Sequence, residues 1–129
     1  MTGDHNHVLE GLTRKILACA FEVHRVLGPG LLESTYRACL LREMGERGLE
    51  AREEVPIAIS YRGRQLDAGY RADLIVDEAV LVELKAVERL LPIHEAQTLT
   101  YLKHARLRVA LLLNFNVARL TSGIRRFIL

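Results

Sequence analysis

The stretch from Tyr70 to Val87 constrains the fold of this chain more than any other, because an apolar hairpin there carries three charged side chains. It predicts two strands joined by a tight turn, with Asp73 in the first strand and Glu83 and Lys85 in the second. Side chains alternate between the faces of a strand, so Glu83 and Lys85 point the same way. Buried charges are costly without a partner. A divalent cation is the simplest partner for two carboxylates, so the stretch predicts a metal site.

Periodic patterns predict the elements around this hairpin. Apolar residues at three- and four-residue spacing predict helices over about residues 6–27, 30–47 and 91–105. Alternating and β-branched residues predict strands over residues 50–55, 57–61, 65–76, 79–87 and 109–115, and a last strand or hairpin return over 124–129. This order is typical of an α/β sandwich built around a mixed sheet.

Length and composition narrow the class of protein. The 129 residues, half of them apolar, are enough for one core, so we expect a single domain over residues 1–129. A net charge of +2 favours no particular polyanionic partner. The longest apolar run, Val109–Leu113, is too short to cross a bilayer, so no membrane partner is expected. Two cysteines without CxxC spacing, and no signal-peptide pattern, predict a reduced, cytoplasmic protein.

The charged residues of the hairpin indicate a reaction. With a main-chain carbonyl and waters, Asp73 and Glu83 would suit the oxygen shell that Mg²⁺ or Mn²⁺ prefers. Lys85 would position an attacking water or stabilise developing negative charge. Gln97 and Tyr101 lie four residues apart on the following helix, so they share a face from which they could contact substrate or orient the lysine. The pattern indicates metal-assisted phosphodiester hydrolysis; the alternative is a surface hairpin whose charges are simply solvated.

Glu33 has two interpretations. It falls in the first turn of the second predicted helix, where a negative charge complements the helix dipole. Alternatively, it points into the same cleft as Asp73 and Glu83. Periodicity alone favours the dipole role.

The order of these residues resembles a known superfamily. Glu33, Asp73 and Glu83-Leu84-Lys85, followed by Gln97-x-x-x-Tyr101, resemble the PD-(D/E)XK nuclease superfamily. The resemblance implies a restriction-endonuclease-like αβββαβ core, a mixed central sheet flanked by helices, and an extra N-terminal helix. Ala72, rather than a proline, precedes Asp73.

A shorter segment narrows the resemblance. GLLESTY, through Gly30, Glu33 and Tyr36, is similar to the signature of the small bacterial GxxExxY protein family, and later segments are similar to that family over nearly the whole chain. This likeness raises the expectation that Glu33 serves the site.

The resemblance also implies roles. Asp73 and Glu83 would be ligands of Mg²⁺ (or Mn²⁺), with Glu33 as an additional acid at the metal, and Lys85 would be the catalytic lysine. The Gln97–Tyr101 pair is similar to that of the exonuclease branch, so both residues are candidates for substrate binding. Two further candidates for substrate binding are Tyr36 and Arg71.

Two classes of function follow. The first is a Mg²⁺-dependent nuclease acting on DNA. Cations that could line its phosphate path are Arg25, Arg37, Arg71, Lys103, His104 and Arg106. The alternative is a catalytically silent nucleic-acid- or protein-binding module of the same fold, which the near-neutral charge favours.

We expect a homodimer, because a chain this small offers little surface for gripping a duplex. The apolar N-terminal helix would form the interface, unless it is wholly occupied in covering the sheet.

Overall fold

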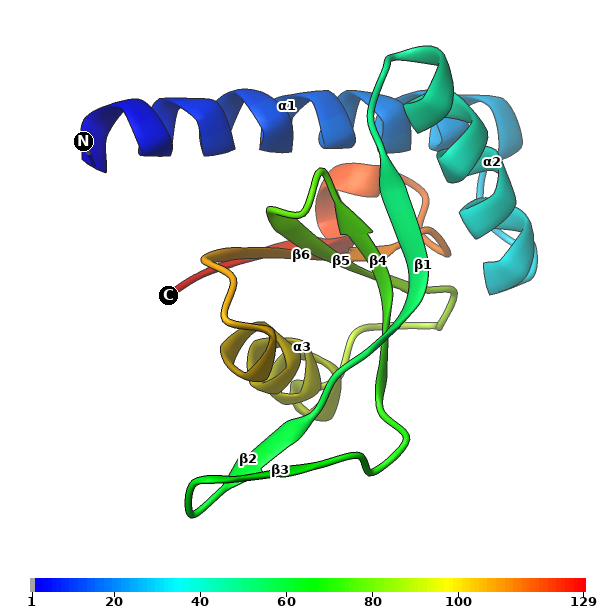
Figure 1. Ribbon diagram of the computed structural model, residues 1–129. Helices are drawn as coiled ribbons and strands as arrows, with labels where there is room; N and C mark the ends of the chain where they lie inside the picture. Colours follow the sequence, from blue (N-terminus) through cyan, green and yellow to red (C-terminus); the bar gives the residue numbers. More distant parts are fainter. Residues whose placement is uncertain (1) are drawn as a thin grey trace.

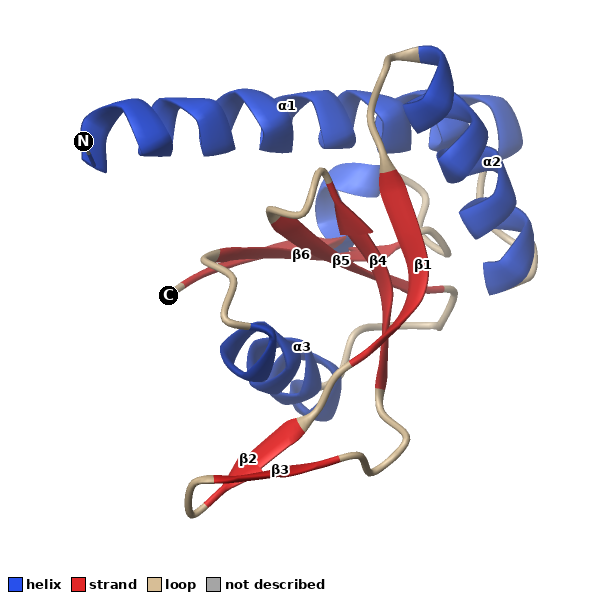
Figure 2. Ribbon diagram, in the orientation of Figure 1, coloured by secondary structure: helices blue, strands red, loops and turns tan. Residues whose placement is uncertain are grey.

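A five-stranded mixed sheet lies at the centre of the computed structural model, which describes residues 2–129, with side chains described from residue 6 on. Helices α1 and α2 lie on one face of the sheet and α3 on the other (Figures 1 and 2). In chain order the elements are α1 (Thr2–Leu27), α2 (Glu33–Glu46), β1 (Ala51–Pro56), β2 (Ile59–Tyr61), β3 (Arg64–Leu66), β4 (Arg71–Val76), β5 (Val80–Lys85), α3 (Pro92–Ala105), β6 (Val109–Asn114), a 3₁₀ helix (Leu120–Gly123) and β7 (Ile124–Ile128).

The strands are ordered β1-β4-β5-β6-β7. β5 and β6 pair in parallel through a crossover that contains α3, and the other neighbours pair antiparallel. This arrangement confirms the predicted mixed sheet flanked by helices, with an extra N-terminal helix, and is consistent with the restriction-endonuclease-like core.

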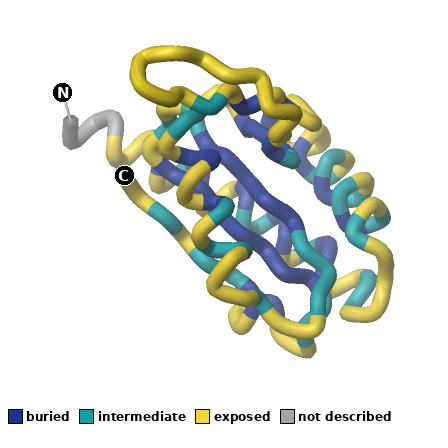
Figure 3. Tube along the Cα trace, turned by 90° about the horizontal axis from the view of Figure 1, so that it is seen from below, coloured by how far each residue is buried: buried dark blue, intermediate teal, exposed yellow. Residues whose placement is uncertain are grey.

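The sheet separates two apolar clusters. One contains the buried stripe of α1 together with buried side chains of α2, and the other contains Tyr101 and Leu102 of α3. Every residue of β6 is buried, because helices cover both faces of the sheet (Figure 3). This double cover explains why the sequence of β6 is a continuous apolar run rather than an alternating one.

α1 is amphipathic as predicted. Its buried side chains recur at helical spacing: Leu9, Leu12, Ile16, Cys19, Ala20 and Val23. Within the described part of the chain, no helix is both long and apolar enough to cross a bilayer.

The predicted strand over residues 65–76 is wrong, because the structure divides it into β3 and β4. Gly69 adopts a φ of 81° in the connection, a left-handed conformation that interrupts an extended chain. β2 and β3 instead form a separate two-stranded ribbon that projects past α3 (Figure 1). Arg62 and Gly63, both at positive φ, form the tight turn that joins them.

Candidate functional site

The backbone pairing of β4 with β5 stops where the predicted site begins. The last pair in the register is Leu74 with Val82, so Asp73 and Glu83 come next. There, carboxylates replace carbonyl groups as hydrogen-bond acceptors. The Asp73 N–H donates to Glu83 Oε1 at 2.9 Å, and the Leu84 N–H donates to Asp73 Oδ2 at 2.7 Å. The opened strand pair itself therefore brings the two predicted carboxylates together.

Near Asp73, the side chains of β1 and β4 also switch from one face of the sheet to the other. Glu54, which the register places opposite Asp73, has a φ of 50°. Ala72 packs with Ile75 in the cluster on the α3 side, whereas Leu74 packs on the α1 side. The alternation of faces expected of a regular strand therefore fails in β4 between Ala72 and Leu74. The break turns Asp73 toward α2.

Glu83 is the most deeply buried acid of the site, with 4% of its surface exposed. Burial raises the pKa of its carboxyl to about 8, and the neighbouring Asp73 carboxylate adds to the rise. The Asp73 N–H and the Lys85 ammonium oppose the rise without cancelling it. Glu83 therefore holds a proton near neutral pH unless further positive charge arrives.

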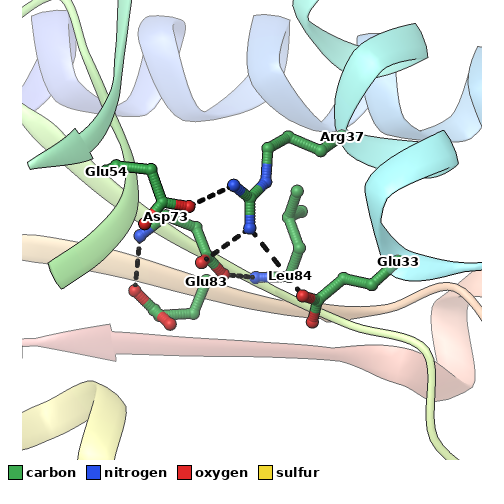
Figure 4. Close-up of polar contacts among 6 residues, drawn as sticks. All are labelled: Glu33, Arg37, Glu54, Asp73, Glu83 and Leu84. Carbon is green, nitrogen blue, oxygen red and sulfur yellow. Dashed lines mark hydrogen bonds and ion pairs between the residues drawn. The ribbon is translucent and has the colours of Figure 1, made fainter.

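Arg37 of α2 holds three carboxylates together (Figure 4). Its Nη2 donates to Asp73 Oδ1 at 3.1 Å and lies 3.8 Å from Glu33 Oε2, while its Nη1 donates to Glu54. The side chain of Arg37 is 19% exposed and that of Asp73 is 16% exposed, so water screens their ion pair only in part.

Glu33 points toward this cluster, in line with the second of its two interpretations. It lies one helical turn before Arg37, so the two share a face of α2. Burial raises the pKa of the Glu33 carboxyl, and the charge of Asp73 raises it further, while Lys85 and Arg37 lower it. The four groups are therefore close enough to influence one another electrostatically.

Lys85 ends β5 on the same face as Glu83, as strand alternation predicts. Its side chain is half-buried, and its positive charge lowers the pKa of both Glu33 and Glu83. Lys85 thus lies within electrostatic reach of both acids.

On the α3 side, Gln97 and Tyr101 meet as their spacing predicts. Gln97 Nε2 donates to the Tyr101 hydroxyl at 3.1 Å, and the Tyr101 ring lies against Tyr70, with 5.9 Å between ring centroids. Burial raises the pKa of the Tyr101 hydroxyl, and the charge of Glu83 adds to this rise. The pair therefore borders the site from the face opposite α2.

The prediction that Tyr36 binds substrate is wrong as a direct contact, because its side chain is fully buried. The ring stacks on Phe115 with 4.8 Å between centroids, and the hydroxyl donates to the Gly28 carbonyl at 2.6 Å and accepts from the Leu31 N–H at 3.2 Å. Tyr36 instead fastens the loop before α2, which carries Glu33. Arg71, by contrast, is exposed at the start of β4, two residues before Asp73.

The charges of the site fit a divalent cation. Asp73 and its surroundings form a group of four carboxylates and two cationic side chains: Glu33, Glu54, Asp73, Glu83, Arg37 and Lys85. With all of them ionised, two negative charges stay uncompensated. Hard cations prefer oxygen donors of this kind, and Asp73 with Glu83 supplies an adjacent pair.

The ligand shell is not preformed. Among the described residues, no group of three or more His, Cys, Asp or Glu side chains is arranged to hold a metal ion. Arg37 lies between Glu33 and Asp73, so these two acids and Glu83 do not form the three-carboxylate set that the sequence predicts.

The sequence identified the acids and the lysine but missed two partners. The sequence predicts Arg37 only as a possible phosphate contact, although its spacing of four residues from Glu33 indicates that the two side chains share a face of the helix. Glu54 carried no signal, because its place opposite Asp73 depends on how β1 pairs with β4.

Comparisons with known proteins agree with this geometry at the level of a superfamily. A family model described as the PD-(D/E)XK nuclease superfamily matches residues 10–127, which include every residue of the site. Neither a curated protein nor a solved structure matches the chain significantly.

Proposed function

Because this chain belongs to the PD-(D/E)XK nuclease superfamily, we propose that it is a metal-dependent nuclease that hydrolyses phosphodiester bonds in DNA. One observation carries the proposal: the buried Glu83 carboxyl lies beside Asp73 in a group of side chains that would carry two uncompensated negative charges with every carboxyl ionised. Such an arrangement is costly in a protein that has no use for a cation.

Asp73 and Glu83 would hold Mg²⁺ or Mn²⁺, with Glu33 as a further acid nearby. A bound divalent cation supplies two effects here, a lower pKa for a coordinated water and partial neutralisation of the phosphate. Lys85, as a compact cation on the same face as Glu83, would hold the attacking water and stabilise the charge that develops on phosphate.

Substrate would enter between α2 and α3. Gln97 and Tyr101 would contact it from α3, and the exposed Arg71 could bind a phosphate beside Asp73. A phosphate contact of this kind anchors the backbone without reading its sequence.

A catalytically silent binding module is the second candidate. Arg37 already neutralises part of the charge of Asp73, so the fold can persist without metal. A protein that has kept the fold but lost turnover would share this feature.

Cleavage assays separate the two candidates. Plasmid and single-stranded DNA would be incubated with Mg²⁺ or Mn²⁺ and either the wild type, Lys85→Ala or Asp73→Ala. The exposed Lys15 of α1 provides a matched control, Lys15→Ala. We expect each site variant to lose at least about 10²-fold in rate while the control keeps full activity. Equal residual cleavage by all four proteins would exclude catalysis at this site.

We also propose that the chain is a member of the GxxExxY family and forms a homodimer. The position of Glu33 in the cluster and the burial of Tyr36 support the first point, since both belong to the GLLESTY segment. The apolar stripe of α1 is occupied by the sheet, so a dimer through α1 would use its outer face, where Val8, Phe21 and Val26 are exposed. A monomer by light scattering at micromolar concentration would exclude the dimer.

A further inference from the structure

Arg37 occupies a position that the proposed metal would compete for. Its guanidinium contacts Glu33, Glu54 and Asp73 at once (Figure 4), and its side chain is largely buried. No other cationic side chain among the described residues contacts an acid of the proposed ligand set at ion-pair distance. Its Nε, moreover, is buried and has no hydrogen-bond partner in the described chain. Arg37 is therefore held in place by its charge interactions rather than by a fully satisfied hydrogen-bond network.

The oxygens of Asp73 define the competition. Oδ2 accepts the Leu84 N–H at 2.7 Å, a bond that fixes the carboxylate to β5. Oδ1 accepts from Arg37 Nη2 at 3.1 Å. A cation that binds Asp73 through Oδ1 must therefore share that oxygen with a guanidinium, and two positive charges at this distance repel each other.

Glu54 offers Arg37 a second partner. It hydrogen-bonds to Nη1, while Nη2 contacts Asp73 and Glu33. Glu54 comes from β1 and its side chain is 54% exposed, so it lies at the outer side of the cluster. Arg37 can give up Asp73 and keep Glu54, which means that its charge need not become fully solvated when a cation arrives.

We propose that Arg37 is an internal counter-ion for Asp73, which holds the carboxylates together without metal and yields Asp73 to a divalent cation. This inference rests on the metal site of the proposed function. Arg37 is thus a positioning residue that sets the affinity of the site for its cation. Glu54 is the acceptor that retains the guanidinium when Asp73 is engaged.

Titration calorimetry with Mn²⁺ alone tests this role without any nuclease assay. The variants are Arg37→Met and, as a matched control, Arg52→Met, since Arg52 of β1 forms an exposed pair with Glu78 in the turn after β4. We expect Arg37→Met to bind Mn²⁺ about five- to tenfold more tightly than wild type, because the competitor is gone. Arg52→Met should bind as wild type does. If Arg37→Met is too unstable to purify, Arg37→Lys replaces it, with a smaller shift in the same direction because an ammonium lacks the planar fork.

A double-mutant cycle isolates the part played by Glu54. Glu54→Gln should weaken Mn²⁺ binding about threefold or more in wild type, because Arg37 then keeps only Asp73 and the more distant Glu33 as acidic partners. The effect should be smaller in the Arg37→Met background. Equal effects in both backgrounds would show that Glu54 acts only as a nearby charge, which overturns its role as acceptor.

The outcomes also separate this inference from the proposed function. If wild type binds Mn²⁺ and Arg37→Met binds it equally or more weakly, the counter-ion role is wrong and the metal site stands. If Arg37→Met binds Mn²⁺ and wild type does not, competition is supported in its strongest form. If neither protein binds Mn²⁺, both the inference and the metal site of the proposed function are wrong.

Discussion

Two clusters of arginine and acid lie along the β1–β4 pair. At the Ala51–Val76 end, Arg52 pairs with Glu78; near the middle of the pair, Arg37 pairs with Glu54 and Asp73. In each cluster the glutamate has a left-handed backbone, with a φ of 56° for Glu78 and 50° for Glu54.

Beside each cluster an aspartate carboxylate also accepts a backbone N–H from a neighbouring segment. Asp77 accepts from Glu50 at 2.8 Å, and Asp73 accepts from Leu84 at 2.7 Å. The two clusters therefore contain the same residue types and the same kinds of hydrogen bond.

The two clusters differ in how deeply their side chains are buried. The side chains of Arg52 and Glu78 are 56% and 67% exposed, whereas those of Arg37 and Asp73 are 19% and 16% exposed. Glu83 next to Asp73 has almost no exposure. Water screens the exposed cluster, so its ion pair contributes little to stability, although Glu78 still raises the pKa of Arg52. In the buried cluster, burial and the charge of Asp73 raise the pKa of the Glu33 and Glu83 carboxyls, which favours a cation. The two clusters contain the same residue types, so the difference in their electrostatic properties follows from burial rather than from composition.

The largest expected difference between the two clusters is in DNA cleavage. Asp73→Asn should reduce metal-dependent DNA cleavage by about 10³-fold, because an amide cannot balance the charge of a cation. Asp77→Asn should cleave as wild type does, since Asn keeps an oxygen for the Glu50 N–H and tolerates the positive φ of Asp77. Initial rates on plasmid DNA measure both variants. Comparable losses of cleavage rate in the two variants would contradict the difference between the two clusters.

The next effect is a dependence of stability on pH. The pKa of Glu83 is about 8 in the folded protein and near 4.5 otherwise, so the folded state retains a proton that the unfolded state releases across this range. Stability therefore falls as the pH rises. We expect the free energy of unfolding to decrease by about 2–3 kcal/mol between about pH 5 and pH 8; the release of one proton can lower it by at most about 1.4 kcal/mol per pH unit. Urea unfolding without divalent metal measures it.

The control for this pH effect is a pair of amide variants. Glu83→Gln should flatten the profile and leave the protein more stable than wild type near pH 8, whereas Glu78→Gln should keep the wild-type slope. An unchanged slope in Glu83→Gln would assign the pH effect to other groups.

A smaller effect should appear in the stability of the arginine variants. Without metal, Arg37→Met should lose about 1–2 kcal/mol, because Asp73 is left as a partly buried charge without its partner. Arg52→Met should show no measurable change, since both members of its pair are exposed. Thermal and urea unfolding at neutral pH compare them. Equal losses would mean that burial does not separate the two pairs.

The smallest effect concerns the two left-handed glutamates. Glu78→Gly relieves the positive φ at the cost of greater chain entropy when unfolded, so a net gain of no more than about 0.5 kcal/mol is expected. Glu54→Gly relieves the same conformation but deprives Arg37 of an acceptor, so it should be destabilising. Urea unfolding measures the change in the free energy of unfolding for each variant. Changes of opposite sign would support the difference between the two clusters, and changes of the same sign would contradict it.

Short-range features of this protein were determined by sequence spacing. Alternation along a strand put Glu83 and Lys85 on one face, and a spacing of four residues joined Gln97 to Tyr101. Apolar periodicity located α1, α2, α3 and most strands, because helices and strands have fixed repeats.

Only the tertiary structure decided how these pieces meet. The register of β1 on β4 placed Glu54 opposite Asp73, and the opening of the β4–β5 ladder made the Asp73 and Glu83 carboxylates acceptors for backbone N–H groups. It also buried Tyr36, which spacing alone could not distinguish from a residue that contacts substrate. Contacts between distant segments depend on pairing register and on the depth of burial, and neither quantity is contained in the spacing of residues along the chain. The sequence therefore named the acids and the lysine, and the fold supplied the arginine that stands among them.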